Sequence, residues 1–135
     1  MGPHDRAFQE TPGLKLSIVV PAFNEERLLP GTLDSINAAA QAFDAAGGWE
    51  LIVCDNNSTD RTAEIARAAG ARVVFEPHNQ ISRARNTGAA AATGEWLLFV
   101  DAAAQQTPVL IGMSFLRHVD LRRSGNTMLL IRADR

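Results

Sequence analysis

The chain has one cysteine, Cys54, and no long hydrophobic run. A single cysteine cannot form an internal disulfide, and the apolar residues around Cys54 favour a buried structural thiol over a reactive one. No segment approaches the roughly 20 apolar residues that a membrane-spanning helix needs. The first dozen residues match neither a signal peptide nor a membrane span. These absences predict a location in the cytoplasm or peripheral to the membrane.

Signatures of several function classes are also missing. The Gly-rich dinucleotide fingerprint does not follow the first apolar strand, which argues against a nicotinamide oxidoreductase. There is no GKS or GKT phosphate loop and no Gly-x-Ser-x-Gly elbow. His4, His78 and His118 lack metal-ligand spacing, which argues against zinc. The net charge of −2 argues against nucleic acid as a partner.

What the chain does contain is an alternation of short apolar strands and helical segments. Its 135 residues, 46% of them hydrophobic, are enough for one domain with a real core. The alternation predicts an α/β fold: a mostly parallel sheet with right-handed crossovers and helices on both faces. Residues 1–13 are predicted to be a flexible N-terminal tail, and residues 14–135 a single domain.

Local signals predict where each element begins and ends. The predicted strands are 15–21, 49–55, 71–75, 95–100 and 128–131. A first helix is expected to start near Leu29 and Pro30 and to end at Gly47 and Gly48. The later helices are expected to be one capped by Ser58 or Thr59 and closed by Gly70, one over 83–92 capped by Ser82, and one from 108 to about 118.

Polar residues follow three of the predicted strands, and strand ends of this kind build ligand sites in open α/β sheets. Asn24 and Glu25 either hold a nucleotide or form an ordinary polar loop. Asp55 either accepts hydrogen bonds from a base or ribose, or forms the turn before the next helix. Asp101 can contact ribose or help hold a hard cation such as magnesium or manganese.

Two arginines, Arg83 and Arg85, lie at the start of the third predicted helix. A guanidinium there opposes the helix dipole, so a bound diphosphate would explain the placement. A solvated charged face is the alternative interpretation.

Four segments, in this order and spacing, resemble the family 2 glycosyltransferases, which have the GT-A fold of the nucleotide-diphospho-sugar transferase superfamily. The resemblance covers Leu14 to Asp101, about two thirds of the chain. The matching segments are 18–25 (IVVPAFNE), 53–60 (VCDNNSTD), 81–86 (ISRARN) with Gly88, and 94–101 (GEWLLFVD).

This resemblance implies the N-terminal, nucleotide-binding half of a GT-A (Rossmann-like) domain. It implies a UDP- or GDP-sugar donor and transfer of the sugar to an acceptor hydroxyl on a saccharide or lipid. Asp55 would read the base, Arg83 would approach the donor, and Asp101 would be the first acid of the Asp-x-Asp element, which contacts the ribose and the metal-bound diphosphate. The full set of implied donor-binding residues is Pro21, Ala22, Asn24, Glu25, Asp55, Asn57, Arg83 and Asp101.

The sequence departs from the family pattern in two ways. Ala103 stands where the second acid of Asp-x-Asp belongs, and alanine cannot ligate the magnesium or manganese that the family implies. The chain also ends before the family's acceptor site and catalytic base, so it looks truncated and no base is assigned. Three hypotheses follow: a truncated donor domain of an enzyme, a non-catalytic nucleotide-sugar-binding remnant, and a relic that binds nothing. Missing residues could leave an exposed sheet edge and promote self-association.

Overall fold

The fold is built on a five-stranded sheet. A computed structural model describes residues 15–44, 48–102 and 128–132, and the strand order is β3-β2-β1-β4-β5. Neighbouring strands among the first four run parallel, and β5 pairs with β4 in the antiparallel sense. The strands are β1 (Leu16–Ala22), β2 (Trp49–Asp55), β3 (Arg72–Phe75), β4 (Trp96–Val100) and β5 (Met128–Arg132). The predicted α/β fold with a mostly parallel sheet is therefore confirmed.

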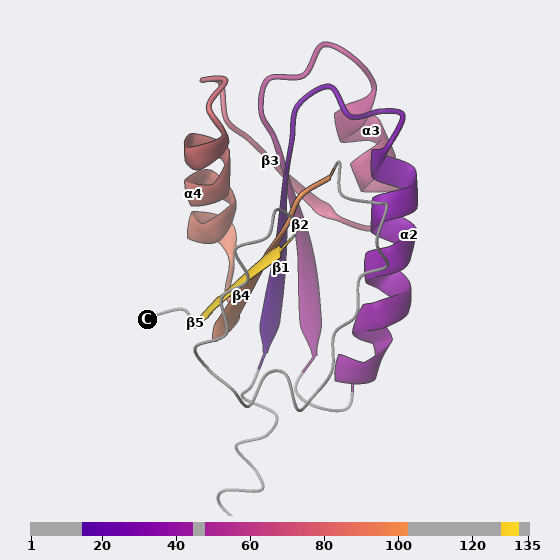
Figure 1. The fold of residues 1–135 in the computed structure, drawn as a ribbon, viewed down its shortest axis with the longest axis vertical. Coiled ribbons are helices and arrows are strands. Elements are labelled where there is room, and N and C mark those ends of the chain that lie inside the picture. The colour runs from indigo at the N-terminus through magenta and orange to yellow at the C-terminus, as the bar shows by residue number, and fades with distance from the viewer. Residues whose placement is uncertain (1–14, 45–47, 103–127, 133–135) are drawn as a thin grey trace, which may run out of the picture.

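Helices cover both faces of this sheet, as predicted (Figure 1). On one side lie α2 (Leu29–Ala40) and α3 (Thr62–Ala68), and on the other lies α4 (Ile81–Ala91). A short 3₁₀ turn, η2 (Gln41–Phe43), extends α2. Because parallel strands need crossovers, each helix returns the chain to the same end of the sheet, and all the strand-to-helix loops gather at the other end.

The core has two layers, one on each face of the sheet. All seven residues of β1 are buried, as its unbroken apolar sequence predicts. The layer under α2 and α3 includes Leu29, Leu33 and Ile36, which form the buried stripe of α2. The layer under α4 includes Val19, Ile52, Ala92, Leu97 and Phe99. Burial on both faces makes β1 the central strand of the domain.

Two predicted boundaries of α2 and β1 need correction. The glycines at 47 and 48 do not end α2, which stops at Ala40 and continues as the 3₁₀ turn η2. Gly48 instead takes a left-handed backbone (φ 90°) just before β2. The first strand runs one residue past the prediction, to Ala22, because its parallel pairing with Asp55 continues beyond Pro21.

The predicted caps of α3 and α4 were wrong. Asp60, not Ser58 or Thr59, holds the start of α3, because its Oδ1 accepts from the backbone N–H of Thr62 at 2.9 Å. The helix α4 begins at Ile81, so Ser82 lies inside it and Gln80 takes the N-cap position. Gly70, with φ 88°, does follow the end of α3 as predicted. The predicted tail at 1–13 and helix at 108–118 lie outside the described residues.

A polar cluster fixes the amino end of the sheet, opposite the loops. The Ser17 hydroxyl donates to Glu50 Oε2 at 2.5 Å and accepts from the Gly94 N–H at 2.8 Å. The Thr93 N–H also donates to Glu50, at 2.6 Å. Burial alone would raise the pKa of Glu50, but the hydrogen bonds from Ser17 and Thr93 outweigh it and lower the pKa. A side chain at position 94 would meet Ser17 and the Lys15 carbonyl, which explains the glycine.

The two outer strands are β3 and β5. The pairing of β5 with β4 means that β4 is not an edge, whereas β3 leaves Arg72 and Phe75 exposed. Charged residues on an outer strand discourage pairing with another chain. In the part of the chain that the structure describes, no helix has the length and apolar character required to cross a membrane.

The contact between α4 and β1 gives a first prediction. A methyl group at Gly88 would overlap Val19 Cγ1, so we expect Gly88→Ala to lower the free energy of unfolding by about 1–3 kcal/mol. Gly31→Ala in α2 is the matched control, because nothing lies within 4 Å of its added methyl. Alanine there should be neutral or stabilise by up to about 1 kcal/mol. Urea unfolding of both variants measures the difference, and equal signs would contradict the close packing of α4.

Candidate functional site

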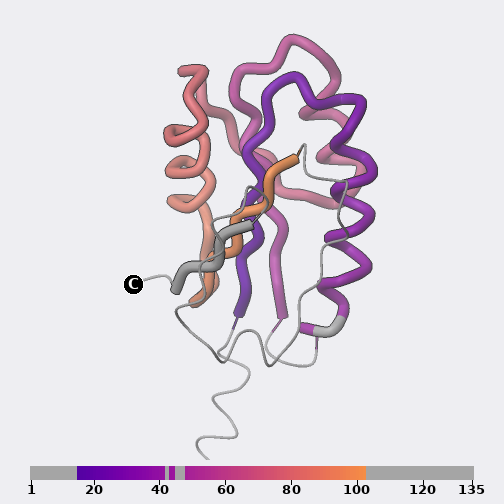
Figure 2. The backbone as a smooth tube through the Cα atoms, in the orientation of Figure 1, coloured from indigo at the N-terminus to yellow at the C-terminus, as the bar shows by residue number. Residues whose placement is uncertain are grey.

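The candidate site is the carboxyl rim, defined here as loops 23–28, 56–61 and 76–80 together with Asp101. These residues follow β1, β2, β3 and β4. Figure 2 shows the first three loops gathered at one end of the molecule. Carboxyl ends of parallel strands are where open α/β sheets bind ligands, and this end carries every site residue that the sequence predicted.

Side-chain hydrogen bonds join the first two loops. The Asn24 N–H donates to Ser58 Oγ at 2.9 Å, and the Thr59 N–H donates back to Asn24 Oδ1 at 2.8 Å. The Glu25 N–H donates to Thr62 Oγ1 at 2.9 Å. The side-chain oxygen of Asn24 therefore accepts a hydrogen bond within the protein, and this bond links the two loops.

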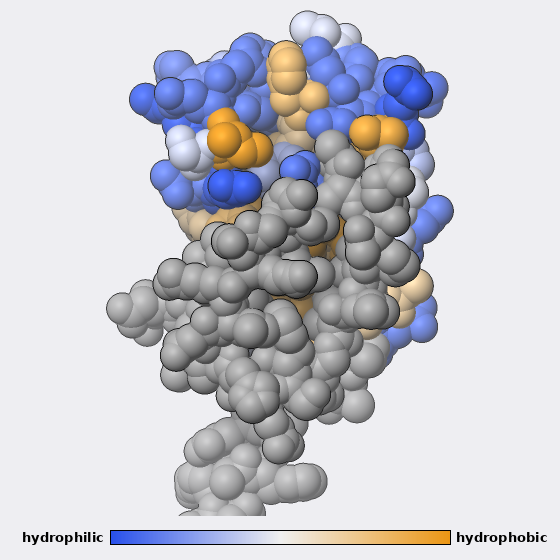
Figure 3. Space-filling model, in the orientation of Figure 1, coloured by the Kyte–Doolittle hydropathy of each residue, from blue (hydrophilic) through white to orange (hydrophobic). Residues whose placement is uncertain are grey.

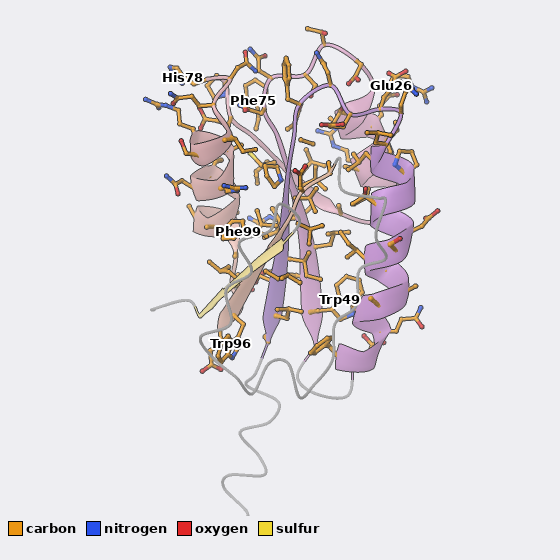
Figure 4. The ribbon with its side chains drawn as sticks, viewed as in Figure 1. Glu26, Trp49, Phe75, His78, Trp96 and Phe99 are labelled. Atoms are coloured by element: carbon orange, nitrogen blue, oxygen red, sulfur yellow. The ribbon has the colours of Figure 1, made fainter. Side chains whose placement is uncertain are left out.

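A second tie lies one residue further along. The Glu26 N–H donates to Asp60 Oδ2 at 3.1 Å, and the Arg61 N–H donates to Glu26 Oε1 at 3.0 Å. Asp60 thus holds the start of α3 with one oxygen and the first loop with the other. Figure 4 shows Glu26 at the end of the molecule opposite Trp49 and Trp96.

Two asparagines allow the tight turns of the rim. Asn24 and Asn57 have φ of 51° and 63°, and they are the non-glycine residues with positive φ in the described chain. Asparagine tolerates this left-handed region better than most residues. The Asn57 amide also donates to the Pro77 carbonyl at 3.2 Å, which links the second loop to the third.

Asp55 has the turn-forming role that was one of its two sequence interpretations. Its side chain is 8% exposed, and its Oδ1 accepts from the Ser58 N–H at 3.0 Å, as a turn-forming aspartate does. Its Oδ2 has no hydrogen-bond partner among the described residues. One oxygen is therefore fixed by the turn, which orients the other as an acceptor for a ligand.

Asn56 is a site-forming residue that sequence reasoning missed. It is 4% exposed, and its amide donates to the carbonyls of Glu76 and His78 at 3.0 and 2.5 Å. Its own N–H donates to the Ala22 carbonyl at 2.8 Å. Asn56 therefore connects the ends of β1, β2 and β3. In the sequence it looks like one more polar turn residue, and nothing there signals its burial.

The third loop is fixed internally by Glu76. The Thr87 hydroxyl donates to Glu76 Oε1 at 2.7 Å, and the His78 N–H donates to Oε2 at 2.9 Å. The bond from Thr87, followed by that from His78, lowers the pKa of Glu76. His78 and Phe75 lie together near this loop in Figure 4.

The guanidinium of Arg83 lies at the start of α4, where its Nε donates to Gln80 Oε1 at 2.8 Å. Both Arg83 and Arg85 are exposed. The bond to Gln80, the N-cap residue, holds Arg83 beside the helix N-terminus. This placement allows contact with an anion and equally allows a solvated surface arginine.

Negative charge concentrates between the first loop and the end of β4. Burial raises the pKa of Glu25, and the charges of Asp101 and then Asp60 raise it further. Hydrogen bonds from Thr62 lower the pKa of Asp60 despite the opposing effect of burial. Glu25 is therefore held near two carboxylates, and a cationic or hydrogen-bond-donating ligand would relieve the repulsion.

A hollow of about 350 Å³ opens on the outer side of the first loop. It is lined by Asn24, Glu25, Glu26, Arg27, Leu28 and Asp60. It shares two residues with the predicted set but does not reach Asp55, Arg83 or Asp101, so we do not assign the donor to it. Figure 3 shows that the described surface at this end is mostly hydrophilic with isolated apolar spots.

The possible metal ligands and the cysteine of the described chain are two sets of candidate reactive groups. Across residues 15–44, 48–102 and 128–132, no group of three or more His, Cys, Asp or Glu side chains is placed to hold a metal ion. Cys54 is buried, and burial, followed by the charges of Glu76 and Asp55, raises its pKa to about 11. The predicted inert structural thiol is confirmed.

Comparison with known proteins identifies the family of this chain. Residues 17–112 match the family described as Glycosyl transferase family 2. An uncharacterized glycosyltransferase of Mycobacterium bovis is 39% identical over 90 residues, which cover 67% of this chain and 37% of the relative. The PGL/p-HBAD biosynthesis glycosyltransferase of Mycobacterium bovis is 37% identical over 92 residues, covering 64% and 34%.

Solved structures agree with the family match. Glucosyl-3-phosphoglycerate synthase from Mycobacterium tuberculosis, crystallised with Mn²⁺, UDP and glucosyl-3-phosphoglycerate, has a TM-score of 0.58 and 31% identity. The match covers 70% of this chain and 35% of that one. A complex of the same synthase with Mg²⁺ and UDP matches at 29% identity, a TM-score of 0.58, and 76% and 38% coverage.

The fold defines a Rossmann-like α/β protein with a mostly parallel sheet. Within that class, the chain belongs to glycosyl transferase family 2 and has its GT-A fold. It spans about a third of the length of the curated relatives it matches. The resemblance found in the four sequence segments is thus confirmed.

The repulsion at Glu25 gives a second prediction. A carboxyl with a raised pKa favours folding while it is protonated, and that contribution is lost as the pH rises through the raised value. Glu25→Gln removes the charge, so we expect a higher melting temperature than the parent chain at neutral pH. The difference should shrink below the ordinary value of 4.5, where Glu25 is protonated.

The control for this experiment is Asp34→Asn, which changes an exposed carboxylate on α2 away from the rim. It should give no such gain at neutral pH. Melting curves of the three chains across the acid range measure the effect. A Glu25→Gln chain that melts at or below the parent at neutral pH would show that Glu25 is not under repulsion.

Proposed function

We propose that this chain is the donor-binding part of a family 2 glycosyltransferase that transfers sugar from a nucleoside-diphosphate sugar to an acceptor hydroxyl. Family membership supports the reaction class. The observation that carries the proposal is Asp55, whose Oδ1 is fixed by Ser58 and whose Oδ2 has no partner among the described residues. It lies at the same end of the sheet as Asp101 and the start of α4.

The donor-binding residues of this proposal are those that the sequence predicted. Asp55 Oδ2 accepts a hydrogen bond from the base. Arg83, beside the N-terminus of α4, faces the diphosphate, because guanidinium and helix N-termini both favour phosphate. Asp101 contacts the ribose or diphosphate end. The remaining members, which shape the pocket, are Pro21, Ala22, Asn24, Glu25 and Asn57.

Uracil is the base that we propose first. Several solved structures that match this chain hold UDP, and the imide N–H of uracil is a suitable donor to a fixed carboxylate oxygen. A GDP-sugar is the alternative, because guanine also presents N–H donors. The sugar and the acceptor are left open by the proposal, since the chain spans about a third of its relatives.

A metal does not fit the described residues as a preformed site. The relatives were crystallised with Mn²⁺ or Mg²⁺, yet the described chain has no group of three or more potential ligands. Asp101 is the acid available on the family's metal-binding element, and Ala103 replaces the second acid. Magnesium and manganese usually need one or two carboxylates plus phosphate and water. The described residues alone therefore do not form a metal site, and any bound cation would need further oxygen ligands from the diphosphate and water.

The non-catalytic binding module is the second candidate function. The alanine at position 103, in place of the second acid, is the observation behind it. Both candidates require the nucleotide pocket, so binding must be established before turnover. Release of UDP from a UDP-sugar by the purified chain would then support the enzyme, and tight binding without release would support the module. The cytoplasmic location and self-association through an exposed sheet edge stay predictions.

Base recognition by Asp55 gives a third prediction. We expect calorimetric titration of the chain with UDP to give saturable binding. Asp55→Asn keeps an oxygen for the Ser58 N–H but turns the second oxygen into an NH₂ donor. The dissociation constant for UDP should therefore rise about 10-fold or more, the size expected for losing a charged hydrogen bond of roughly 1.5–3 kcal/mol.

Asp34→Asn serves again as the control and should bind UDP as the parent chain does. A parallel titration with GDP tests the alternative base. If Asp55→Asn binds UDP with unchanged affinity, Asp55 is only a turn former. If the folded parent chain binds neither nucleotide, the donor proposal itself fails.

Restoring the missing acid gives a fourth prediction. Ala103→Asp adds a second carboxylate two residues after Asp101, so UDP binding should become tighter with Mn²⁺ than without it. Ala104→Asp adds the same charge one position away and should give no such enhancement. Titrations with and without Mn²⁺ measure the effect. Unchanged metal dependence in Ala103→Asp would mean that Asp101 is not the first acid of the family element.

A further inference from the structure

A residue in the first turns of α2 binds the carbonyl of Ala102, the residue that follows Asp101. Thr32 is 2% exposed, and its hydroxyl donates to the carbonyl of Ala102 at 2.7 Å. The two residues lie 70 positions apart in the chain. The same hydroxyl is 3.3 Å from the Leu28 carbonyl, the usual i−4 partner of a helical threonine. The shorter distance makes Ala102 the main partner, so this contact is more than helix self-bonding.

This hydrogen bond limits the freedom of Asp101. The residue before it, Val100, is 2% exposed and ends β4, and the residue after it, Ala102, is 0% exposed. Asp101 is itself exposed. The aspartate is therefore a solvent-facing side chain between two buried neighbours, and Thr32 anchors the carbonyl of the second.

The same part of α2 also holds Glu25. The Glu25 carbonyl accepts from the N–H groups of Leu28 and Leu29 at 3.1 and 2.8 Å, so Glu25 leads directly into the helix. Thr32 lies one turn further on. A short rigid segment thus connects the backbone of Glu25 to the backbone that follows Asp101. The spacing between the two carboxylates depends on it.

We propose that Thr32 is a positioning residue that fixes the Asp101 carboxylate relative to Glu25 and to the bound donor. The donor part of this inference rests on the proposed function. Thr32 is buried between helix and sheet, so we expect no direct contact between its side chain and the donor. It acts on Asp101 through the Ala102 carbonyl, so its effect can be separated from that of the Asp101 side chain by mutation.

The test compares Thr32→Val, which keeps the shape and removes the hydroxyl, with Thr32→Ser, which keeps the hydroxyl. We expect Thr32→Val to weaken UDP binding about 5-fold, because Asp101 is held less firmly before the donor binds, and Thr32→Ser to bind as the parent does. In an Asp101→Ala background, Thr32→Val should have no further effect. Equal weakening in both backgrounds would show a general structural role and overturn the proposal.

A second readout needs no ligand. Burial, then the charges of Asp101 and Asp60, raises the carboxyl pKa of Glu25, and an NMR titration of the chain and its variants would measure that pKa. Asp101→Ala should lower this pKa, and Thr32→Val should lower it part of the way, because Asp101 is no longer held in place. A value unchanged in Thr32→Val overturns the positioning role. If Thr32→Val does not fold, Thr32→Cys, with similar volume and a weaker donor, replaces it.

The two readouts separate the failure of this inference from the failure of the proposed function. A parent chain that does not bind UDP overturns the donor proposal, while the Glu25 titration still tests Thr32. A parent chain that binds UDP, with a folded Thr32→Val that binds equally well, overturns the role of Thr32 and leaves the donor proposal in place.

Discussion

The double-sided burial of β1 is the constraint on which the other features depend. Its backbone pairs with β2 and β4, and its side chains enter both core layers. Because neighbouring strands are parallel and in fixed register, their ends coincide, and Ala22 lies opposite Asp55. The meeting of Asn24, Asp55 and Asp101 at one end is thus a product of strand pairing. No long-range attraction between these polar residues is needed to assemble them.

The polar residues of the rim serve the fold as well as the site. The side-chain oxygens of Asn24 and Asp60 accept hydrogen bonds from backbone N–H groups of a neighbouring loop or of α3. Asn56 is buried, and its side-chain amide and backbone N–H join three strand ends. Preorganised groups of this kind lose little entropy when a ligand binds. Conversely, several substitutions at the rim should change folding as well as binding, which is why isosteric variants are more informative than alanine.

Most of the fold was predictable from the sequence, because apolar runs and helical spacing determine which segments are buried. The strand at 49–55 and the start of α2 at Leu29 were predicted correctly. The helix caps were not, because several residues in 58–60 can cap and only the fold shows that Asp60 does so. Asn56 and Thr32 were missed for a related reason: their partners lie 20 to 70 residues away, and no local pattern encodes such contacts.

The carboxylates at the two ends of the sheet give the domain a chemical polarity. At the amino end, Glu50 is ionised to satisfy Ser17 and Thr93, and the lowered pKa means that its contribution is lost only as the pH falls through that value. At the rim, Glu25 has a raised pKa, so its protonated form is favoured relative to an ordinary glutamate. As the pH falls, Glu25 is therefore protonated first, which relieves its repulsion at the rim. Glu50 is protonated only at a lower pH, where the hydrogen bonds at the amino end weaken. A mildly acidic solution should hold the empty rim in its least strained state.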